Sequence, residues 1–225
     1  MNRVGRAAGA LGARGGAALA RMGGAAGPGP GPAGYRACAG GLIFDRRGRL
    51  LVFERSDRPG QWQFPQGGLD EGEDDRAAAA REVWEETGLR APTVTFVSTL
   101  RERLRYDVPP GTWLETKGFR GQQMAWSLFF FEPDTDAPSQ FCNLDGLGGE
   151  KPEFKAVRWA SWAEVLESMA AFKRPVYERL SEIAPLEMNK FLSDKNLGAD
   201  GCSRIGVGAV RLGHLSSRRA PRADT

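Results

Sequence analysis

The chain has 225 residues, of which 41% are hydrophobic and 9% aromatic, and this is enough for the core of one domain. No segment approaches the run of about 18 apolar residues that a membrane span needs, so we expect no membrane partner. Residues 1–44 hold five arginines and no acidic residue, whereas residues 45–194 hold 20 basic and 26 acidic residues, a net charge of −6. This acidic middle favours a cation-binding site over the basic surface of a nucleic-acid binder.

The cysteines and the histidine argue against a Cys/His zinc site. Cys38, Cys142 and Cys202 are far apart, no CxxC pair occurs, and His214 is the only histidine. Structural zinc sites need closely spaced pairs of such ligands. We therefore expect free thiols in a reducing compartment.

Residues 1–34 consist mainly of Ala, Gly, Arg and Pro, and the segment GPGPGPAG can form neither a helix nor a central strand. An acid-free, arginine-bearing leader is typical of an organelle transit peptide, although the usual serine enrichment is missing. The alternative is a disordered low-complexity extension. We expect location in an organelle matrix, chloroplast before mitochondrion, with the cytoplasm as the alternative.

Several apolar segments predict strands. Residues 42–44 and 50–53 flank a glycine-bearing turn at 45–49, which predicts a hairpin. Residues 93–98 and 126–131 are rich in strand-forming residues, and residues 156–160 form a further short candidate.

Two helical regions follow from start and stop signals. The first spans residues 75–87, with Gly88 as its C-terminal stop. The second begins at Ser161, which forms a capping box with Glu164 and leads to a helix ending near 171. Pro175 suits the first turn of another helix, ending near 183. Strands interleaved with helices predict an α/β sandwich around a mixed sheet over residues 35–190, followed by a disordered tail at 191–225.

Three glutamates share one face of the first helix. At 100° per residue, Glu85 and Glu86 fall within 60° of Glu82, and we expect the buried face to lie on the opposite side. The residues that define this predicted buried face are Ala77, Ala80, Val83 and Trp84. Like charges one turn apart destabilise a helix unless a cation or solvent screens them. Mg²⁺ is suitable because it prefers oxygen ligands, whereas a solvated acidic surface is the alternative.

The residues around this helix decide between the two interpretations. From Gly67 the sequence matches the pattern Gly-x5-Glu-x7-Arg-Glu-U-x-Glu-Glu-x-Gly-U, in which U is a bulky aliphatic residue, at every fixed position. Chance odds are on the order of 10⁻⁹ per start site at average residue frequencies. The segment resembles the Nudix box. The fixed residues are Gly67, Glu73, Arg81, Glu82, Val83, Glu85, Glu86, Gly88 and Leu89.

The resemblance implies a Nudix-type α/β/α sandwich and a loop–helix–loop site for Mg²⁺ or Mn²⁺. In such a site Glu82, Glu85 and Glu86 ligate the metal, and Gly67 lets the backbone approach it. Glu73 and Arg81 brace the loop against the helix, and Gly88 ends the helix. The metal neutralises charge on a phosphate chain and activates the attacking water, which implies a hydrolase acting on phosphoanhydride bonds.

The flanking segments narrow the resemblance to one branch. The segments WQFPQGG, YDVPP, EKPEF and FKRPVY resemble plant-type dinucleoside tetraphosphate hydrolases and bacterial RNA pyrophosphohydrolases. Position by position, Glu153 matches a further metal ligand and general base. Arg36, Arg55 and Lys173 match positions that contact phosphates, Gln122 matches a substrate-binding position, and Tyr106 and Phe172 match positions that sandwich a base. Ala125 stands where the branch often has lysine, so one phosphate contact is lost.

Three functions remain open. The first is hydrolysis of dinucleoside polyphosphates, such as diadenosine tetraphosphate to ATP and AMP, and of related pentaphosphates or guanosine tetraphosphate-type alarmones. The second is removal of pyrophosphate from the 5′ end of RNA, against which the acidic middle argues mildly. The third is a catalytically silent nucleotide-binding module, against which the complete set of helix glutamates argues.

Overall fold

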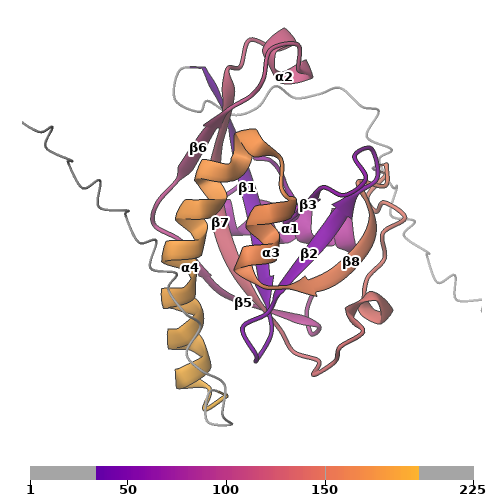
Figure 1. Ribbon diagram of the computed structural model, residues 1–225, viewed down its shortest axis with the longest axis vertical. Coiled ribbons are helices and arrows are strands. Elements are labelled where there is room, and N and C mark those ends of the chain that lie inside the picture. The colour runs from indigo at the N-terminus through magenta and orange to yellow at the C-terminus, as the bar shows by residue number, and fades with distance from the viewer. Residues whose placement is uncertain (1–33, 150, 198–225) are drawn as a thin grey trace, which may run out of the picture.

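The computed structural model describes residues 34–149 and 151–197, so that most of the leader, Cys202 and His214 lie outside the described residues. Eight strands form one sheet whose main order is β3-β2-β1-β7-β5 (Figure 1). β4 pairs with β1, β6 with β7, and β8 with β2. The strands are β1 (Tyr35–Phe44), β2 (Leu50–Arg55), β3 (Trp62–Gln63), β4 (Gln66–Gly68), β5 (Val94–Thr99), β6 (Leu104–Asp107), β7 (Gly121–Phe131) and β8 (Phe154–Ala160).

The sheet is mixed, as predicted. β1 and β7 run parallel from Tyr35 opposite Gly121 to Phe44 opposite Phe130, and the other strand pairs are antiparallel. The hairpin prediction is confirmed by the antiparallel pairing of β1 with β2. The short strands β3, β4 and β6 were not predicted, because segments of two to four residues carry no periodic signal.

Helices cover both faces of the sheet, which confirms the α/β/α sandwich (Figure 1). Residues of β1 alternate between the two cores: Cys38 and Leu42 face α3 (Trp162–Ser168) and α4 (Arg174–Asp194), whereas Ala39 and Ile43 face α1 (Asp75–Thr87). Three short elements complete the fold: α2 (Trp113–Thr116) and the 3₁₀ turns η1 (Pro138–Phe141) and η2 (Ala171–Lys173).

The predicted bounds of α1 are confirmed, and its ends show why. The Asp74 carboxylate accepts a hydrogen bond from the Ala77 amide at 2.8 Å, and Gly88 adopts a φ of 75°, which favours glycine. The predicted capping box of Ser161 and Glu164 is also present at the start of α3.

α4 is longer than predicted, since it continues past Ile183 to Asp194 with Pro185 in its interior. Proline costs about 3 kcal/mol inside an isolated helix. Here the turns on both sides bury Leu180, Met188 and Leu192 in the core, and this packing overrides the break. None of the helices in the described part of the chain combines the length and apolar content of a membrane crossing.

The segment between β3 and β4 is fixed to the core by Phe64. Its ring stacks on Tyr177 at a centroid distance of 5.3 Å, and the Tyr177 hydroxyl accepts a hydrogen bond from the Phe64 amide at 3.3 Å. Trp126 contacts both rings edge-on. This aromatic cluster holds the chain directly before Gln66 and Gly67, and thereby positions β4 against α1.

Candidate active site

Two of the three helix glutamates, Glu82 and Glu86, contact β4. The buried residues of α1 are Ala78, Ala79, Glu82, Val83 and Thr87, whereas Ala77 and Ala80 are exposed. The prediction that the carboxylates lie opposite the buried face is therefore wrong. The cause is β4, which packs against α1 and presents Gly67 to Glu82: a Cβ atom at Gly67 would collide with that carboxylate.

Arg81 connects the glutamates to the loop before the helix. Its Nε and Nη2 atoms donate to the Glu73 carboxylate at 3.0 and 2.8 Å, and Nη2 also donates to the Gly68 carbonyl at 2.7 Å. Its Nη1 atom donates to Glu82 at 2.7 Å and to Glu85 at 3.0 Å. We refer to Arg81, Glu73, Glu82 and Glu85 as the Arg81 network. One guanidinium thus brings Glu82 and Glu85 to a common point.

Glu86 lies beside this network in a similarly desolvated position. Its carboxylate accepts a hydrogen bond from the Gln66 amide at 3.0 Å. Burial, and then repulsion from Glu82 and Glu153, raise the pKa of Glu86 well above its usual range. Burial also raises the pKa of Glu82 to about 7, although Arg81 opposes the shift. The alternative of a solvated acidic face does not describe Glu82, which is 8% exposed.

Glu153 and Arg55, which line the cavity beside the glutamates, form an ion pair. Arg55 also donates to Asp57 at 2.7 Å. The sequence assigned Glu153 to the metal and Arg55 to phosphate, and the structure joins the two by an ion pair. For Glu153 to bind a metal or for Arg55 to bind a phosphate, each residue therefore has to exchange its ion pair with the other for the new partner.

The four carboxylates Glu82, Glu85, Glu86 and Glu153 fit a divalent cation by their chemistry. They offer only oxygen ligands, and repulsion from Glu82 and Glu153 acts on the desolvated Glu86. Within the part of the chain that the structure describes, no three acidic, His or Cys side chains already converge as metal ligands. The reason lies in the arginines, because Arg81 and Arg55 hold three of the four carboxylates. These carboxylates and the backbone at Gly67 are the groups that could hold a divalent cation here.

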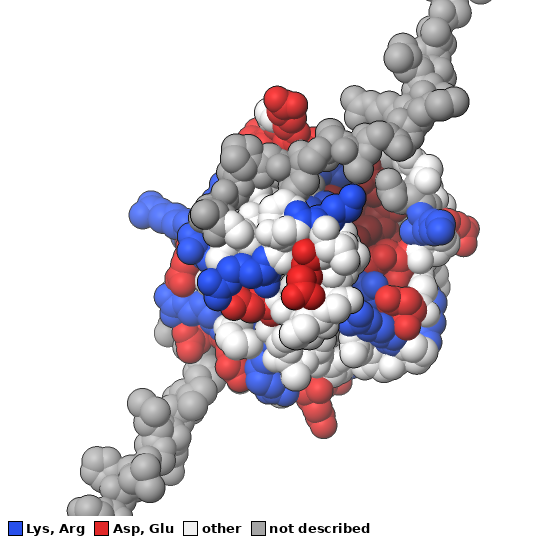
Figure 2. All heavy atoms as spheres, turned by 90° about the horizontal axis from the view of Figure 1, so that it is seen from above, with Lys and Arg blue, Asp and Glu red and all other residues white. Residues whose placement is uncertain are grey.

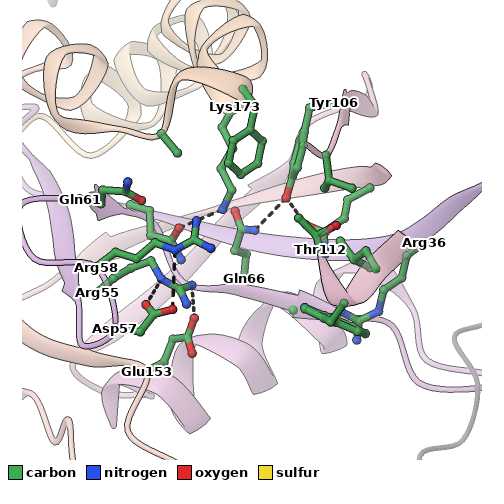
Figure 3. A pocket seen from close by; sticks show the side chains of 18 of the residues that line it. Arg36, Arg55, Asp57, Arg58, Gln61, Gln66, Tyr106, Thr112, Glu153 and Lys173 are labelled. Atoms are coloured by element: carbon green, nitrogen blue, oxygen red, sulfur yellow. Dashed lines mark hydrogen bonds and ion pairs between the residues drawn. The ribbon is translucent and has the colours of Figure 1, made fainter. Parts of the chain in front are cut away.

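A cavity of about 700 Å³ opens next to the glutamates. Its lining includes Gly67 and Glu153 and also four basic residues, namely Arg36, Arg55, Arg58 and Lys173. Figure 3 shows Arg55, Arg58 and Lys173 directed into the same space, with Arg36 on the far side of Gln66. Basic side chains at the wall of an acidic site suit a phosphate chain, which they bind through charge-assisted hydrogen bonds.

Lys173 is a buried cation at the inner end of this wall. Its Nζ atom donates to the Gln63 side chain at 2.9 Å, and the residue is 8% exposed. Burial, and then repulsion from Arg55, lower the pKa of Lys173 to about 8, while Glu86 and Glu153 oppose the shift.

Tyr106 and Phe172 do not form the expected sandwich. Their ring centroids are 5.7 Å apart with the planes tilted by 51°, which is the spacing of a directly contacting pair, so no base fits between them. The Tyr106 hydroxyl bonds to the Gln122 side chain, and Gln122 lines the cavity at 7% exposure. Gln122 thus lies in the cavity wall. Stacking of a base would need another surface, or a movement of Phe172 away from Tyr106.

The NUDIX domain family matches residues 34–180, which is more than half of the chain. The chain belongs to the Nudix family. This assignment agrees with the carboxylate-bearing α1 and the α/β/α fold, and it makes the protein a hydrolase acting on pyrophosphate bonds.

Relatives with defined names align with about two thirds of this Nudix hydrolase. An RNA pyrophosphohydrolase of Cereibacter sphaeroides is 38% identical over 154 residues, which are 67% of this chain and 91% of the relative. Nudix hydrolase 26, chloroplastic, of Arabidopsis thaliana is 36% identical over 154 residues, which are 66% of this chain and 68% of the relative. The E. coli dihydroneopterin triphosphate pyrophosphohydrolase structure aligns with a TM-score of 0.50 at 19% identity, covering 64% of this chain and 92% of that one. That likeness shows the fold alone.

Several residues of the Nudix pocket escaped the sequence analysis. Gln63 and Gln66 belong to the segment WQFPQGG and Gln61 directly precedes it, but none of the three was assigned a role. Others lie in the turn after β2 or directly after YDVPP, where the sequence has no periodicity; among them are Arg58, Thr112 and Trp113. Ala125, which stands at the position of the family's lysine, is 1% exposed in β7 opposite Ala39 of β1.

Proposed function

We propose that this Nudix hydrolase removes pyrophosphate from the 5′ triphosphate end of RNA. The observation that carries the proposal is an open cavity that four basic residues, Gly67 and Glu153 line, next to the glutamates of α1. The RNA pyrophosphohydrolase relative, which aligns over 91% of its own length, supports the same substrate class. In this reaction water attacks phosphorus, the bond between the α and β phosphates breaks, and the RNA keeps a 5′ monophosphate.

In the proposed reaction the chain's own residues mainly bind and orient the substrate. Arg36, Arg58 and Lys173 bind phosphate oxygens, and Arg55 exchanges its ion pair with Glu153 for one with the substrate. This exchange frees Glu153 to accept a proton from a water that lies within about 3 Å of its carboxylate. A divalent cation, Mg²⁺ or Mn²⁺, would neutralise the phosphate charge and activate the water when bound.

Contacts with RNA are expected to be restricted to its first nucleotides. On the face shown in Figure 2, Lys and Arg side chains are interspersed with Asp and Glu side chains, and no continuous basic track crosses its visible part. Proteins that bind long nucleic acid need such a track, because affinity depends on the number of phosphates that they neutralise. The cavity is therefore the proposed recognition site.

The same observation favours a second candidate, hydrolysis of dinucleoside polyphosphates. Diadenosine tetraphosphate carries its charge in one compact chain and needs no further surface. Water attack would yield ATP and AMP. The segments YDVPP and EKPEF support this candidate, since each contributes residues to the cavity: Val108 and Pro110 from the first, and Glu153 from the second.

A product assay separates the candidates. The purified chain with Mg²⁺ is incubated with a 5′-triphosphorylated oligoribonucleotide or with diadenosine tetraphosphate, and kcat/KM is determined for both. We expect pyrophosphate release from RNA with the higher kcat/KM, and a higher value for the dinucleotide would select the second candidate. The Glu85→Gln variant is the control for contaminating activity. Turnover of neither substrate would leave the silent nucleotide-binding module and refute both proposals.

We further infer that the protein acts in the chloroplast. The acid-free leader and the chloroplastic relative of Arabidopsis thaliana support this location. Expression of the full chain fused to a fluorescent protein, compared with a chain starting at Gly34, tests it. Diffuse cytoplasmic signal from the full chain would contradict the inference.

A further inference from the structure

Trp113 is the aromatic residue of the cavity that remains available for stacking. Three aromatic residues line the cavity, of which Tyr106 is 6% exposed and in contact with Phe172. Trp113 is 57% exposed, although tryptophan, the largest side chain, normally buries most of its surface. Packing therefore does not account for this side chain, and its free surface lies at the rim of the site.

Arg36 connects Trp113 with the phosphate-binding wall. Its guanidinium lies over the Trp113 ring at 5.3 Å from the centroid. The same guanidinium also lies against Gly68, where a Cβ atom would collide with its Nη2 atom. Gly68 directly follows Gly67, the residue at the glutamates. The Arg36 guanidinium thus lies between the Trp113 indole and the loop at Gly67 and Gly68. A nucleotide whose phosphate binds Arg36 would therefore have its nucleoside next to the Trp113 indole.

Thr112 supplies a hydrogen-bonding group at the same place. Its hydroxyl oxygen is buried and has no hydrogen-bond partner among the described residues, although Thr112 is the N-cap residue of α2. A buried polar group without a partner costs free energy, which a ligand can restore by bonding to it. Figure 3 shows Thr112 on the Tyr106 side of the cavity, and both residues line it.

We propose that Trp113 stacks a nucleobase of the substrate and that the Thr112 hydroxyl bonds to the edge of that base. The two residues then act as specificity determinants that distinguish a nucleotide from a bare polyphosphate. This inference deepens the proposed function and rests on it for the identity of the substrate. The stacking itself rests on the exposure of Trp113 and its contact with Arg36.

Binding without turnover tests the platform directly. Dissociation constants are measured by calorimetry in EDTA for two probes, a 5′-triphosphorylated adenylyl-guanosine dinucleotide and inorganic tripolyphosphate. We expect Trp113→Ala to weaken dinucleotide binding by about five-fold to 100-fold, the range for loss of one base–aromatic stack, and to change tripolyphosphate binding less than about two-fold. Trp113→Phe, which keeps a ring, should restore most of the difference.

Two further variants complete the test. Thr112→Val keeps the shape and removes the hydroxyl, so it should weaken binding of the dinucleotide alone. Leu186→Ala on α4, which removes another exposed apolar side chain outside the cavity, should change neither constant. In kinetic assays Trp113→Ala should raise KM for the dinucleotide with kcat within about two-fold.

Several outcomes would overturn the inference. Equal weakening of both probes would mean that Trp113 only positions Arg36, and no weakening of either would mean that no base stacks there. A wild-type protein that binds the dinucleotide no better than tripolyphosphate would also refute it. The proposed function fails separately, when the wild-type protein binds the dinucleotide in this way but hydrolyses no substrate.

Discussion

Two clusters of arginines and carboxylates in this protein form ion pairs of similar length but differ in their exposure to solvent. In the Arg81 network, the side chains are 11–24% exposed and touch the cavity loop at Gly68. In the hairpin cluster, which joins Arg46, Arg47 and Arg49 to Asp134 and Asp136, they are 27–74% exposed. Bond lengths hardly differ, at 2.7–3.0 Å and 2.6–3.2 Å. We therefore expect the more buried Arg81 network to contribute more to the free energy of unfolding and to activity than the exposed hairpin cluster.

The largest effect is expected from Glu86→Gln beside the Arg81 network. This change removes a ligand of the proposed cation and should lower kcat by more than about a hundred-fold, because loss of a group that only supports a ligand already costs about 10- to 100-fold. It also removes a desolvated charge that Glu82 and Glu153 repel, so thermal stability without metal should not fall. Melting curves with and without Mg²⁺ check both points. A large loss of stability in EDTA would show a structural role instead.

Arg81→Lys should produce the next largest effect. Lysine cannot bond the two oxygens of Glu73 and the Gly68 carbonyl together, as the planar guanidinium does. We expect a loss of about 2 kcal/mol in the free energy of unfolding, the value for hydrogen bonds to charged groups. We also expect kcat to fall about 10- to 100-fold. Urea titration and steady-state kinetics measure the two effects, and Arg47→Lys in the hairpin cluster is the matched control.

Lys173 extends the comparison to pH. With a pKa of about 8, Lys173 is charged below that pH and neutral above it, whereas an exposed lysine stays charged to about 10. Its attraction for phosphate is therefore lost as pH rises through 8, and kcat/KM of the free enzyme should fall there. Lys173→Met should lower kcat/KM about ten-fold at neutral pH and abolish the fall. The exposed Lys190→Met variant should keep the wild-type profile; a fall that persists in Lys173→Met would assign it to another group.

The smallest effect is expected in the hairpin cluster. Asp134→Asn removes the negative charge that pairs with Arg46 and Arg47, although Arg47 keeps its ion pair with Asp136. Because these groups are more than a third exposed, we expect less than about 1 kcal/mol in the free energy of unfolding and no change in kcat/KM. Loss of activity in this variant would remove the distinction between the two clusters.

Local sequence signals were sufficient for α1. The bounds of α1 follow from the capping carboxylate of Asp74 and the positive φ of Gly88, both of which are local interactions. The end of α4 was predicted near Ile183 but lies at Asp194, because Met188 and Leu192 are buried in the core beyond that point. The short strands β3, β4 and β6 form only by pairing with distant partners.

The sequence by itself determined the types and spacing of the Nudix-box residues, which indicate the family. Only the tertiary structure decided their surroundings: β4 turns Glu82 and Glu86 inward, Arg55 pairs with Glu153, and Phe172 closes on Tyr106. The exposure of Trp113 at the rim is likewise a tertiary fact. The physical reason is that spacing along a helix is a local property, whereas burial and charge pairing depend on which distant segments pack against it.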